Sequence, residues 1–243
     1  MKAVERWYSH RVGQEVNLVR WGTFGTPLLV FPTAGGDFEE IERFHLVRSL
    51  QPLLDEGRIK LYSVDSINGR TVLTGANAHE VGRMMAAFDA VIRNEVVPAI
   101  RTDCQSPSIE IVTAGASIGA FNALEVLCRH PEVFSAALCV SGTFDLTKWL
   151  DGPMTSDFYL SSPIHYLPHL TEGDLLRTLR KRFVLFTHGL GRAEDPGESW
   201  RTAAVLGQMG IPNRVDEWSA EWPHDWVTWR EMFPRYVDEL TRQ

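Results

Sequence analysis

The sequence has few cysteines and no apolar run of membrane-spanning length. Its three cysteines, Cys104, Cys128 and Cys139, are odd in number and widely spaced among 243 residues. That pattern argues against a disulfide framework and fits a reducing compartment. No apolar run reaches the roughly 18 residues of a transmembrane helix. The first 18 residues carry several charges and no apolar core typical of a signal peptide. The sequence therefore predicts a cytoplasmic protein without a membrane partner.

Basic residues are not in excess either. The chain has 24 Lys and Arg against 31 Asp and Glu, a formal net charge of −7. A protein that neutralises phosphates usually carries a basic face, so we expect no nucleic-acid partner. One metal-binding alternative is a late group of histidines and carboxylates: His188, Glu194, Asp195 and His224. Because these residues do not form a compact motif such as HExxH, we predict neither a metal nor another cofactor.

The chain does contain short apolar, β-rich runs that alternate with longer helical patterns. The runs predict strands near residues 16–22, 27–31, 59–64, 108–113, 135–140, 182–187 and 213–220. Apolar residues at helical spacing predict helices over 80–103, 117–131, 200–212 and 226–243. Non-alternating runs are typical of strands buried on both faces, whereas residues 16–22 alternate more and predict an antiparallel edge strand. We therefore expect an α/β fold with a mostly parallel, doubly wound sheet and helices on both faces.

The strands recur over the whole chain without a linker-like stretch. We expect one domain over residues 1–243. Residues 144–180 are the least periodic and are rich in turns and aromatics. This segment is predicted to form a small lid or the wall of a pocket. The oligomeric state stays open, with a homo-oligomer among the options.

A serine lies between two glycines in Gly115-Ala116-Ser117-Ile118-Gly119. The five-residue pattern alone is common, but here it follows a predicted strand and precedes a predicted helix. That setting is the one a nucleophile elbow requires, since the turn leaves no room for side chains two positions before and after the serine. The alternative is a serine that only caps the helix. We predict that Ser117 is a nucleophile.

A serine hydroxyl needs a base, and in this chain order the base follows the serine. His224 comes between the last predicted strand and the last helix, which is where the base belongs; the other late histidines are His165, His169 and His188. The acid that orients the base belongs after the strand at 182–187. We prefer Glu194, with Asp195 as the runner-up and Glu198 as a third candidate.

Two backbone N–H groups are needed to stabilise an oxyanion. Ile118, which directly follows the nucleophile, is the first predicted donor. The second should come from the small residues after an early strand, and Ala34 is preferred over Thr33 or Gly35. Aromatic residues in the irregular segment are candidates for lining a substrate pocket: Phe144, Trp149 and Tyr159. Core packing is the alternative for these side chains.

With these residues identified, the chain resembles the putative esterase family of α/β-hydrolases, which includes esterase D (S-formylglutathione hydrolase) and the antigen 85 mycolyltransferases. The resemblance covers nearly the whole chain and rests on "PTAGGDFEEIERF", "GASIGAFNAL", "SSPIHYLPHL", "GLGRAEDPGESW" and "WPHDWVTWREMFPRYV". It implies an α/β-hydrolase fold and a triad of Ser117, Glu194 or Asp195, and His224. The early loop, Pro-Thr-Ala-Gly-Gly, departs from the His-Gly or Ser-Gly-Leu form of better-known members, which bears on the second oxyanion donor. The loop features that mark the thiol-ester hydrolase branch are not matched here, so no glutathione substrate is carried over.

The residues and the resemblance together predict a function. We expect a serine carboxylic-ester hydrolase that acts through an acyl-enzyme on a small-molecule ester, with a short-chain or aryl group. An acyltransferase with the same triad is the first alternative, because an alcohol or amine can replace water. A non-catalytic binding protein on the same scaffold is the second, because a fold does not guarantee activity.

Overall fold

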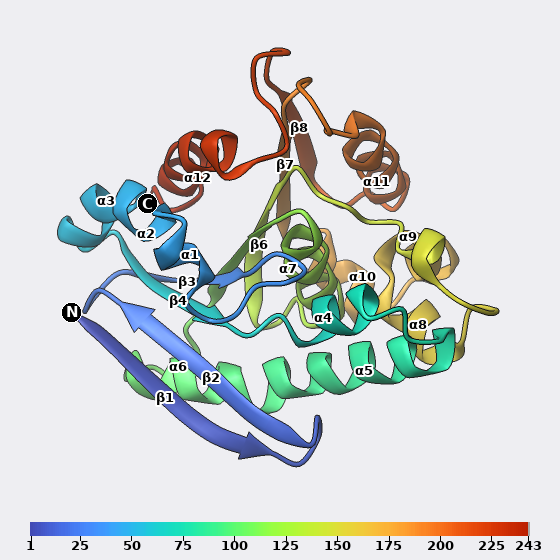
Figure 1. Cartoon of the computed structure of the whole chain (residues 1–243), viewed down its shortest axis with the longest axis horizontal. Helices are drawn as coiled ribbons and strands as arrows, with labels where there is room; N and C mark the ends of the chain where they lie inside the picture. The colour runs from blue at the N-terminus through green and yellow to red at the C-terminus, as the bar shows by residue number, and fades with distance from the viewer. Residues whose placement is uncertain (243) are drawn as a thin grey trace.

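Residues 1–242 are described by a computed structural model, in which a single eight-stranded sheet runs through the molecule (Figure 1). The strands are β1 (Lys2–Ser9), β2 (Gln14–Trp21), β3 (Thr26–Phe31), β4 (Ile59–Val64), β5 (Ile111–Ala116), β6 (Phe134–Val140), β7 (Phe183–His188) and β8 (Asn213–Glu217). Their order is β1-β2-β4-β3-β5-β6-β7-β8. The β1–β2 and β2–β4 pairs are antiparallel and all pairs from β4 to β8 are parallel. The predicted mostly parallel sheet is confirmed.

Helices cover both faces of this sheet (Figure 1). On one face lie α1 (Glu40–Arg43), α2 (Leu46–Ser49), α3 (Gln51–Asp55) and α12 (Trp226–Leu240). On the other lie α4 (Ile67–Leu73), α5 (Ala78–Val91), α6 (Val97–Asp103), α7 (Ile118–Arg129), α8 (Ser156–Ser161), α9 (Pro163–Tyr166), α10 (Asp174–Leu179) and α11 (Pro196–Gln208). Each face has its own apolar cluster, so the sheet is the middle of three layers.

Strand β3 shows why the central strands are apolar at every position. Leu29 and Phe31 point into the cluster beneath α5 and α7, whereas Leu28 and Val30 point into the cluster beneath α2 and α12. Successive side chains of a strand face opposite sides, so a strand covered on both sides must be apolar throughout. The buried runs found in the sequence arise from this arrangement.

The long helix predicted over 80–103 is present but is not uniform. Between α5 and α6 the chain forms a π-helical turn, Ile92–Val96, and Pro98 stands in the first turn of α6. Proline lacks an N–H and its ring collides with the carbonyl four residues earlier. One wider turn before Pro98 accommodates both effects while the helix continues in the same direction.

The segment 144–180 packs onto the core through a set of its apolar side chains, while many of its other residues stay exposed. Four of its apolar side chains, those of Phe158, Leu167, Leu176 and Leu179, are at most 2% exposed, and α8 packs along α5. Only the start of the segment, around the 3₁₀ turn Thr147–Trp149, reaches the cavity described below.

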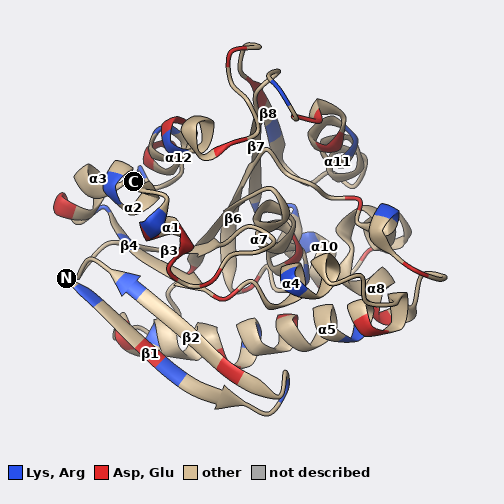
Figure 2. Ribbon diagram, viewed as in Figure 1, with Lys and Arg blue, Asp and Glu red and all other residues tan. Residues whose placement is uncertain are grey.

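Charged residues of both signs are spread over the same elements (Figure 2). Strand β1 carries Lys2, Glu5 and Arg6 within five positions. Within the part of the chain that the structure describes, no helix is both long and apolar enough to cross a membrane.

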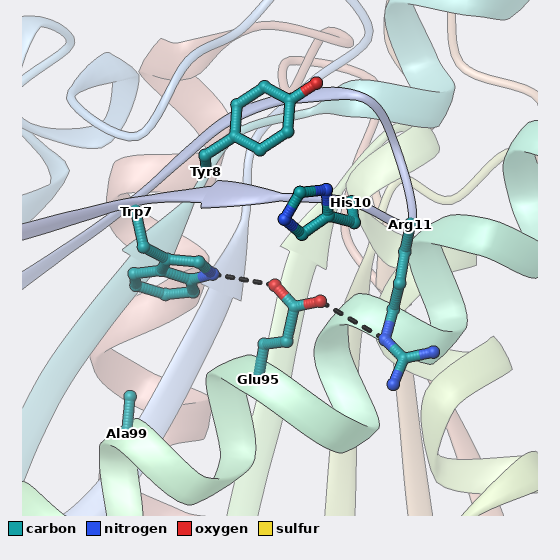
Figure 3. Close-up of a pocket in the computed structure, with 6 residues that line it drawn as sticks. All are labelled: Trp7, Tyr8, His10, Arg11, Glu95 and Ala99. Atoms are coloured by element: carbon teal, nitrogen blue, oxygen red, sulfur yellow. Dashed lines mark hydrogen bonds and ion pairs between the residues drawn. The ribbon is translucent and has the colours of Figure 1, made fainter.

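One carboxylate attaches the β1–β2 hairpin to the π-helical turn (Figure 3). Trp7 Nε1 donates to Glu95 Oε2 at 2.7 Å. Ser9 Oγ donates to Glu95 Oε1 at 2.9 Å. Arg11 Nε lies 3.2 Å from the same Oε1, and the Glu95 side chain is only 20% exposed. All three partners belong to the hairpin, so Glu95 connects an edge of the sheet to the helix below it.

Replacing Glu95 by alanine is expected to lower the free energy of unfolding by about 2 kcal/mol. The change leaves the half-buried indole N–H of Trp7 and the Ser9 hydroxyl without acceptors, and each such loss costs about 1 kcal/mol or more. Urea denaturation measures the effect. Glu132→Ala is the matched control, because Glu132 makes only an exposed pair with Arg93 and should change stability by less than about 0.5 kcal/mol. Equal losses in the two variants would contradict the role assigned to Glu95.

Candidate active site

Ser117 lies at a sharp turn between β5 and α7. Its backbone adopts φ 56° and ψ −123°, a conformation that costs a non-glycine residue of the order of 1–3 kcal/mol. A Cβ on Gly115 would overlap the backbone of Gly119, and a Cβ on Gly119 would overlap the carbonyl of Phe31. The two glycines of the motif are therefore required by space, as the elbow interpretation assumed. This strained turn places Ser117 at the carboxyl end of the central strand β5.

His224 and Glu194 come from two loops that are joined to each other. The loop after β7 approaches the loop after β8 so closely that a Cβ on Gly189 or Gly191 would overlap Trp222. Gly191 N donates to Trp222 O at 3.0 Å, and His224 N donates to the carbonyl of Arg192, also at 3.0 Å. These backbone hydrogen bonds fix the position of His224 relative to Glu194 independently of the contact between their side chains.

The side chains of Glu194 and His224 meet. His224 Nδ1 lies 3.3 Å from Glu194 Oε2, and the ring packs edge-on against Trp229 with centroids 5.1 Å apart. The Glu194 side chain is 2% exposed, whereas the His224 side chain is 23% exposed and His224 reaches the cavity. A buried carboxylate that accepts from Nδ1 leaves Nε2 free to take a proton, which is the geometry of a general base oriented by an acid.

The runner-up acid has a different position. Asp195 is the N-cap of α11, and its Oδ1 accepts from Gly197 N at 3.1 Å. Glu198, the third candidate, is buried and accepts from the backbone N–H groups of Phe144 and Asp145 at 2.7 and 2.9 Å. Both carboxylates border the cavity. Of the three, only Glu194 is within hydrogen-bond distance of His224 among the described residues.

The remaining late histidines have other partners. His188 is buried with Nε2 3.2 Å from Glu217 Oε2. His165 Nδ1 lies 2.7 Å from Ser162 Oγ, and the His169 ring lies near Tyr159. Among residues 1–242 no group of three or more histidine, cysteine or acidic side chains is arranged to hold a metal ion.

The early loop after β3 is shaped by a buried carboxylate. Glu40 is 5% exposed and accepts from Thr33 N at 2.7 Å and from Thr33 Oγ1 at 2.6 Å. Burial raises the pKa of Glu40, while the two bonds from Thr33 oppose that rise. The Thr33 N–H is thereby occupied. Within residues 1–242 the N–H groups of Ala34 and Ile118 donate to no protein acceptor, and both residues border the same cavity as Ser117.

Ser117, His224, Ala34 and Ile118 all line one cavity of about 550 Å³. Of the three aromatic candidates only Trp149 lies among the described lining residues. Phe144 is 1% exposed and packs edge-on against Phe186, and Tyr159 packs beside His169. Those two side chains take the alternative role of core packing, because the segment that carries them folds onto α5 and β7.

Sequence reasoning missed Ser141, which directly follows β6. Its Oγ donates to Glu194 Oε1 at 2.6 Å, so both carboxylate oxygens of Glu194 have a partner. Ser141 is 2% exposed and has φ 45°. A buried non-glycine residue with positive φ is a strained position of the type found at functional sites. The only sequence signal was Ser-Gly at the end of a strand.

Replacing Ser141 by glycine is expected to lower kcat for an activated ester about tenfold with little change in KM. Glycine suits the positive φ, so the variant removes the hydroxyl without adding backbone strain. A hydrogen bond to a charged group is worth roughly 1.5–3 kcal/mol, and its loss lets Glu194 and His224 move. The measurement is a steady-state titration with p-nitrophenyl acetate.

Gln105→Gly provides the control for the backbone change. Gln105 also has a positive φ, 52°, but stands in the turn after α6. We expect its kcat to equal that of the wild type. A Ser141→Gly enzyme with unchanged kcat would show that Ser141 does not position the acid.

A doubly wound sheet, an elbow serine and a histidine–carboxylate pair on the loops after β7 and β8 define an α/β-hydrolase. The "Putative esterase" family model matches residues 69–240. The chain belongs to this family, and the protein is a serine carboxylic-ester hydrolase.

Solved structures with the same fold include enzymes and a mycobacterial protein. A ferulic acid esterase aligns at a TM-score of 0.77 and 15% identity, covering 100% of this chain and 98% of the other. An S-formylglutathione hydrolase from Agrobacterium tumefaciens gives 0.73 and 11%, with coverages of 99% and 93%. Mycobacterium tuberculosis MPT51 gives 0.72 and 13%, with 98% of each chain. At these identities the likeness is one of fold. The search of curated proteins found no sequence match.

Proposed function

We propose that the protein hydrolyses small carboxylic esters through an acyl-enzyme on Ser117. His224 Nε2 takes the hydroxyl proton as Ser117 Oγ attacks the ester carbonyl, and returns it to the leaving alcohol. Water, activated by His224, then releases the acid and restores Ser117. Glu194 holds the imidazole and stabilises its charged form. The N–H groups of Ile118 and Ala34 are the proposed donors to the oxyanion.

The observation that carries this proposal is the shared cavity of a strained elbow serine and a histidine held by a buried glutamate. A serine that served only as a helix cap would accept a bond from the first turn of its helix. The Ser117 side chain makes no such cap bond. Its strained backbone is then unexplained unless the hydroxyl is needed in the cavity.

Short-chain or aryl esters are the proposed substrates. A cavity of about 550 Å³ is within the size range of small-molecule sites. Its wall includes Trp149 from the segment 144–180, which supports a pocket-wall role for the start of that segment within a single domain. A clear preference for long acyl chains would contradict this part of the proposal.

We also propose that the enzyme works in the cytoplasm. Cys104, Cys128 and Cys139 all carry free thiols, and the last two are fully buried. Free thiols in these positions support a reducing compartment. Burial raises the pKa of the Cys128 and Cys139 thiols, so both should be unreactive.

The test is turnover of p-nitrophenyl acetate and p-nitrophenyl butyrate by the purified protein, together with labelling by a fluorophosphonate. We expect turnover of both esters and covalent label on the peptide that contains Ser117. The absence of both turnover and labelling would favour a binding protein on this scaffold. Product analysis with a high concentration of acceptor alcohol separates hydrolysis from acyl transfer.

A further inference from the structure

Among the described residues that line the cavity of Ser117, one is a lysine, and its ammonium makes no close hydrogen bond to the protein. Lys148 borders the cavity from the 3₁₀ turn Thr147–Trp149. Its ammonium stands over the indole of Trp149, 4.5 Å from the ring centroid, and 3.9 Å from Glu198 Oε1. Within residues 1–242 the ammonium donates no hydrogen bond. All three of its N–H groups are therefore available to a ligand.

The two carboxylates on the same wall are already engaged. Glu198 accepts from two backbone N–H groups and pairs with Arg201 at 3.0 Å. Asp195 caps α11 and lies 3.9 Å from the same Arg201. The N-terminus of α11 and the Arg201 guanidinium thus provide closer partners for these carboxylates than Lys148 does. Lys148 is left as the charged group of this wall with unused hydrogen-bonding capacity.

The turn that carries Lys148 is fixed relative to the nucleophile. Thr143 N donates to Ser117 O at 3.2 Å. The next two residues donate their N–H groups to Glu198, and Asp145 then accepts from Thr147 N at 3.0 Å. Thr143 also lines the cavity, and its hydroxyl makes no hydrogen bond in the described chain. An ammonium and a hydroxyl on a fixed loop form a suitable pair of donors for an anion.

We propose that Lys148, with Thr143, binds a carboxylate of the substrate, so that the enzyme prefers small esters that carry a negative charge. This inference rests on the proposed function and adds a substrate class to it. The ester bond is cleaved as described above, and the carboxylate that Lys148 holds takes no part in bond breaking. An ion pair at a half-exposed lysine contributes to recognition rather than to the barrier of the chemical step.

Two pairs of esters test the proposal, each with an anionic and a neutral member of nearly equal shape. Monoethyl glutarate against ethyl 5-methylhexanoate places the charge in the acyl group. The second pair, 4-acetoxybutyrate against 4-methylpentyl acetate, places it in the alcohol. The readout is the ratio of kcat/KM, anionic over neutral, within each pair. We expect the wild-type ratio to be about tenfold in at least one pair and to fall as salt screens the charge.

Lys148→Met removes the charge and keeps an apolar stem against Trp149, and we expect it to bring the ratio to about one. Lys148→Arg should keep the preference. Lys181→Met is the matched control, because Lys181 is exposed just before β7, at the end of the strand away from the cavity, and its ratio should equal that of the wild type. Fluorophosphonate labelling of Ser117 reports that each variant is folded.

The possible outcomes distinguish failure of the carboxylate subsite from failure of the proposed ester hydrolysis. A ratio near one in both wild-type pairs, or a preference that survives Lys148→Met, overturns the carboxylate subsite while ester hydrolysis stands. A protein that neither turns over p-nitrophenyl acetate nor takes the label at Ser117 removes the proposed function and the subsite with it.

Discussion

Replacing Ser117 by alanine is expected to lower kcat for p-nitrophenyl acetate by about 10,000-fold or more. The change removes the atom proposed to attack the carbonyl, and among the described residues the His224 side chain has no hydrogen-bond partner other than Glu194. Enzymes of this mechanism lose nearly all their chemistry when the nucleophile is removed, and only oxyanion stabilisation and substrate binding remain. The loss of kcat is measured by stopped-flow or steady-state kinetics with p-nitrophenyl acetate, at equal concentrations of the two enzymes. Fluorophosphonate labelling should disappear in the same variant.

Stability should not explain this loss. Alanine keeps the Cβ of serine, so the strained backbone at φ 56° is retained, and we expect Tm to change by less than about 2 °C. Ser161→Ala is the matched control: Ser161 is fully buried on α8, and its hydroxyl has no partner among residues 1–242. Its kcat should remain at the wild-type value. Residual Ser117→Ala activity within tenfold of the wild type would place the nucleophile elsewhere.

The sheet was predictable because its central strands are buried on both faces. The run predicted at 59–64 is β4 (Ile59–Val64), and the run at 135–140 lies within β6 (Phe134–Val140). The run predicted at 108–113 instead became β5 (Ile111–Ala116). Alanine and glycine before Ser117 resemble a turn in the sequence, but the chain stays extended until the elbow itself. Apolar content therefore located the strand but not its end.

Strand β1 was not predicted, and the reason is its position at the edge. Seven of its eight residues are exposed or half-buried, and they include charges of both signs. An edge strand with one solvated face needs no continuous apolar run. The strand is held in place by the contacts of Trp7 and Ser9 with Glu95, and these residues are far apart in sequence. Local periodicity carries no information on such a contact.

Candidate site residues that belong to a sequence motif could be predicted, whereas those whose role depends on a buried contact could not. Ser117 and His224 follow from the order of strands and loops. Glu40 and Ser141 do not, because their importance comes from being buried against Thr33 and Glu194. A glutamate in the first turn of a short helix normally faces water. Only the three-dimensional path of the early loop shows that Glu40 faces inward.

Replacing Glu194 by glutamine is expected to lower kcat by about 100- to 10,000-fold, with a smaller effect on KM. The amide cannot stabilise a charged imidazole, and it can present an N–H to His224 Nδ1, which favours the wrong tautomer. The group sits at 2% exposure between Ser141 and His224, so water cannot replace the lost charge. Hydrolysis of p-nitrophenyl acetate across pH measures the loss.

Asp195→Asn is the matched comparison, since it makes the same chemical change at the neighbouring residue. Asparagine is as good an N-cap as aspartate, so the bond from Gly197 and the start of α11 should persist. We expect kcat within about threefold of the wild type. The opposite result, with a large loss in Asp195→Asn and a small one in Glu194→Gln, would transfer the role of the acid to Asp195. The loop would then have to reorganise on substrate binding, because the capping bond and the contact with His224 require different positions of that carboxylate.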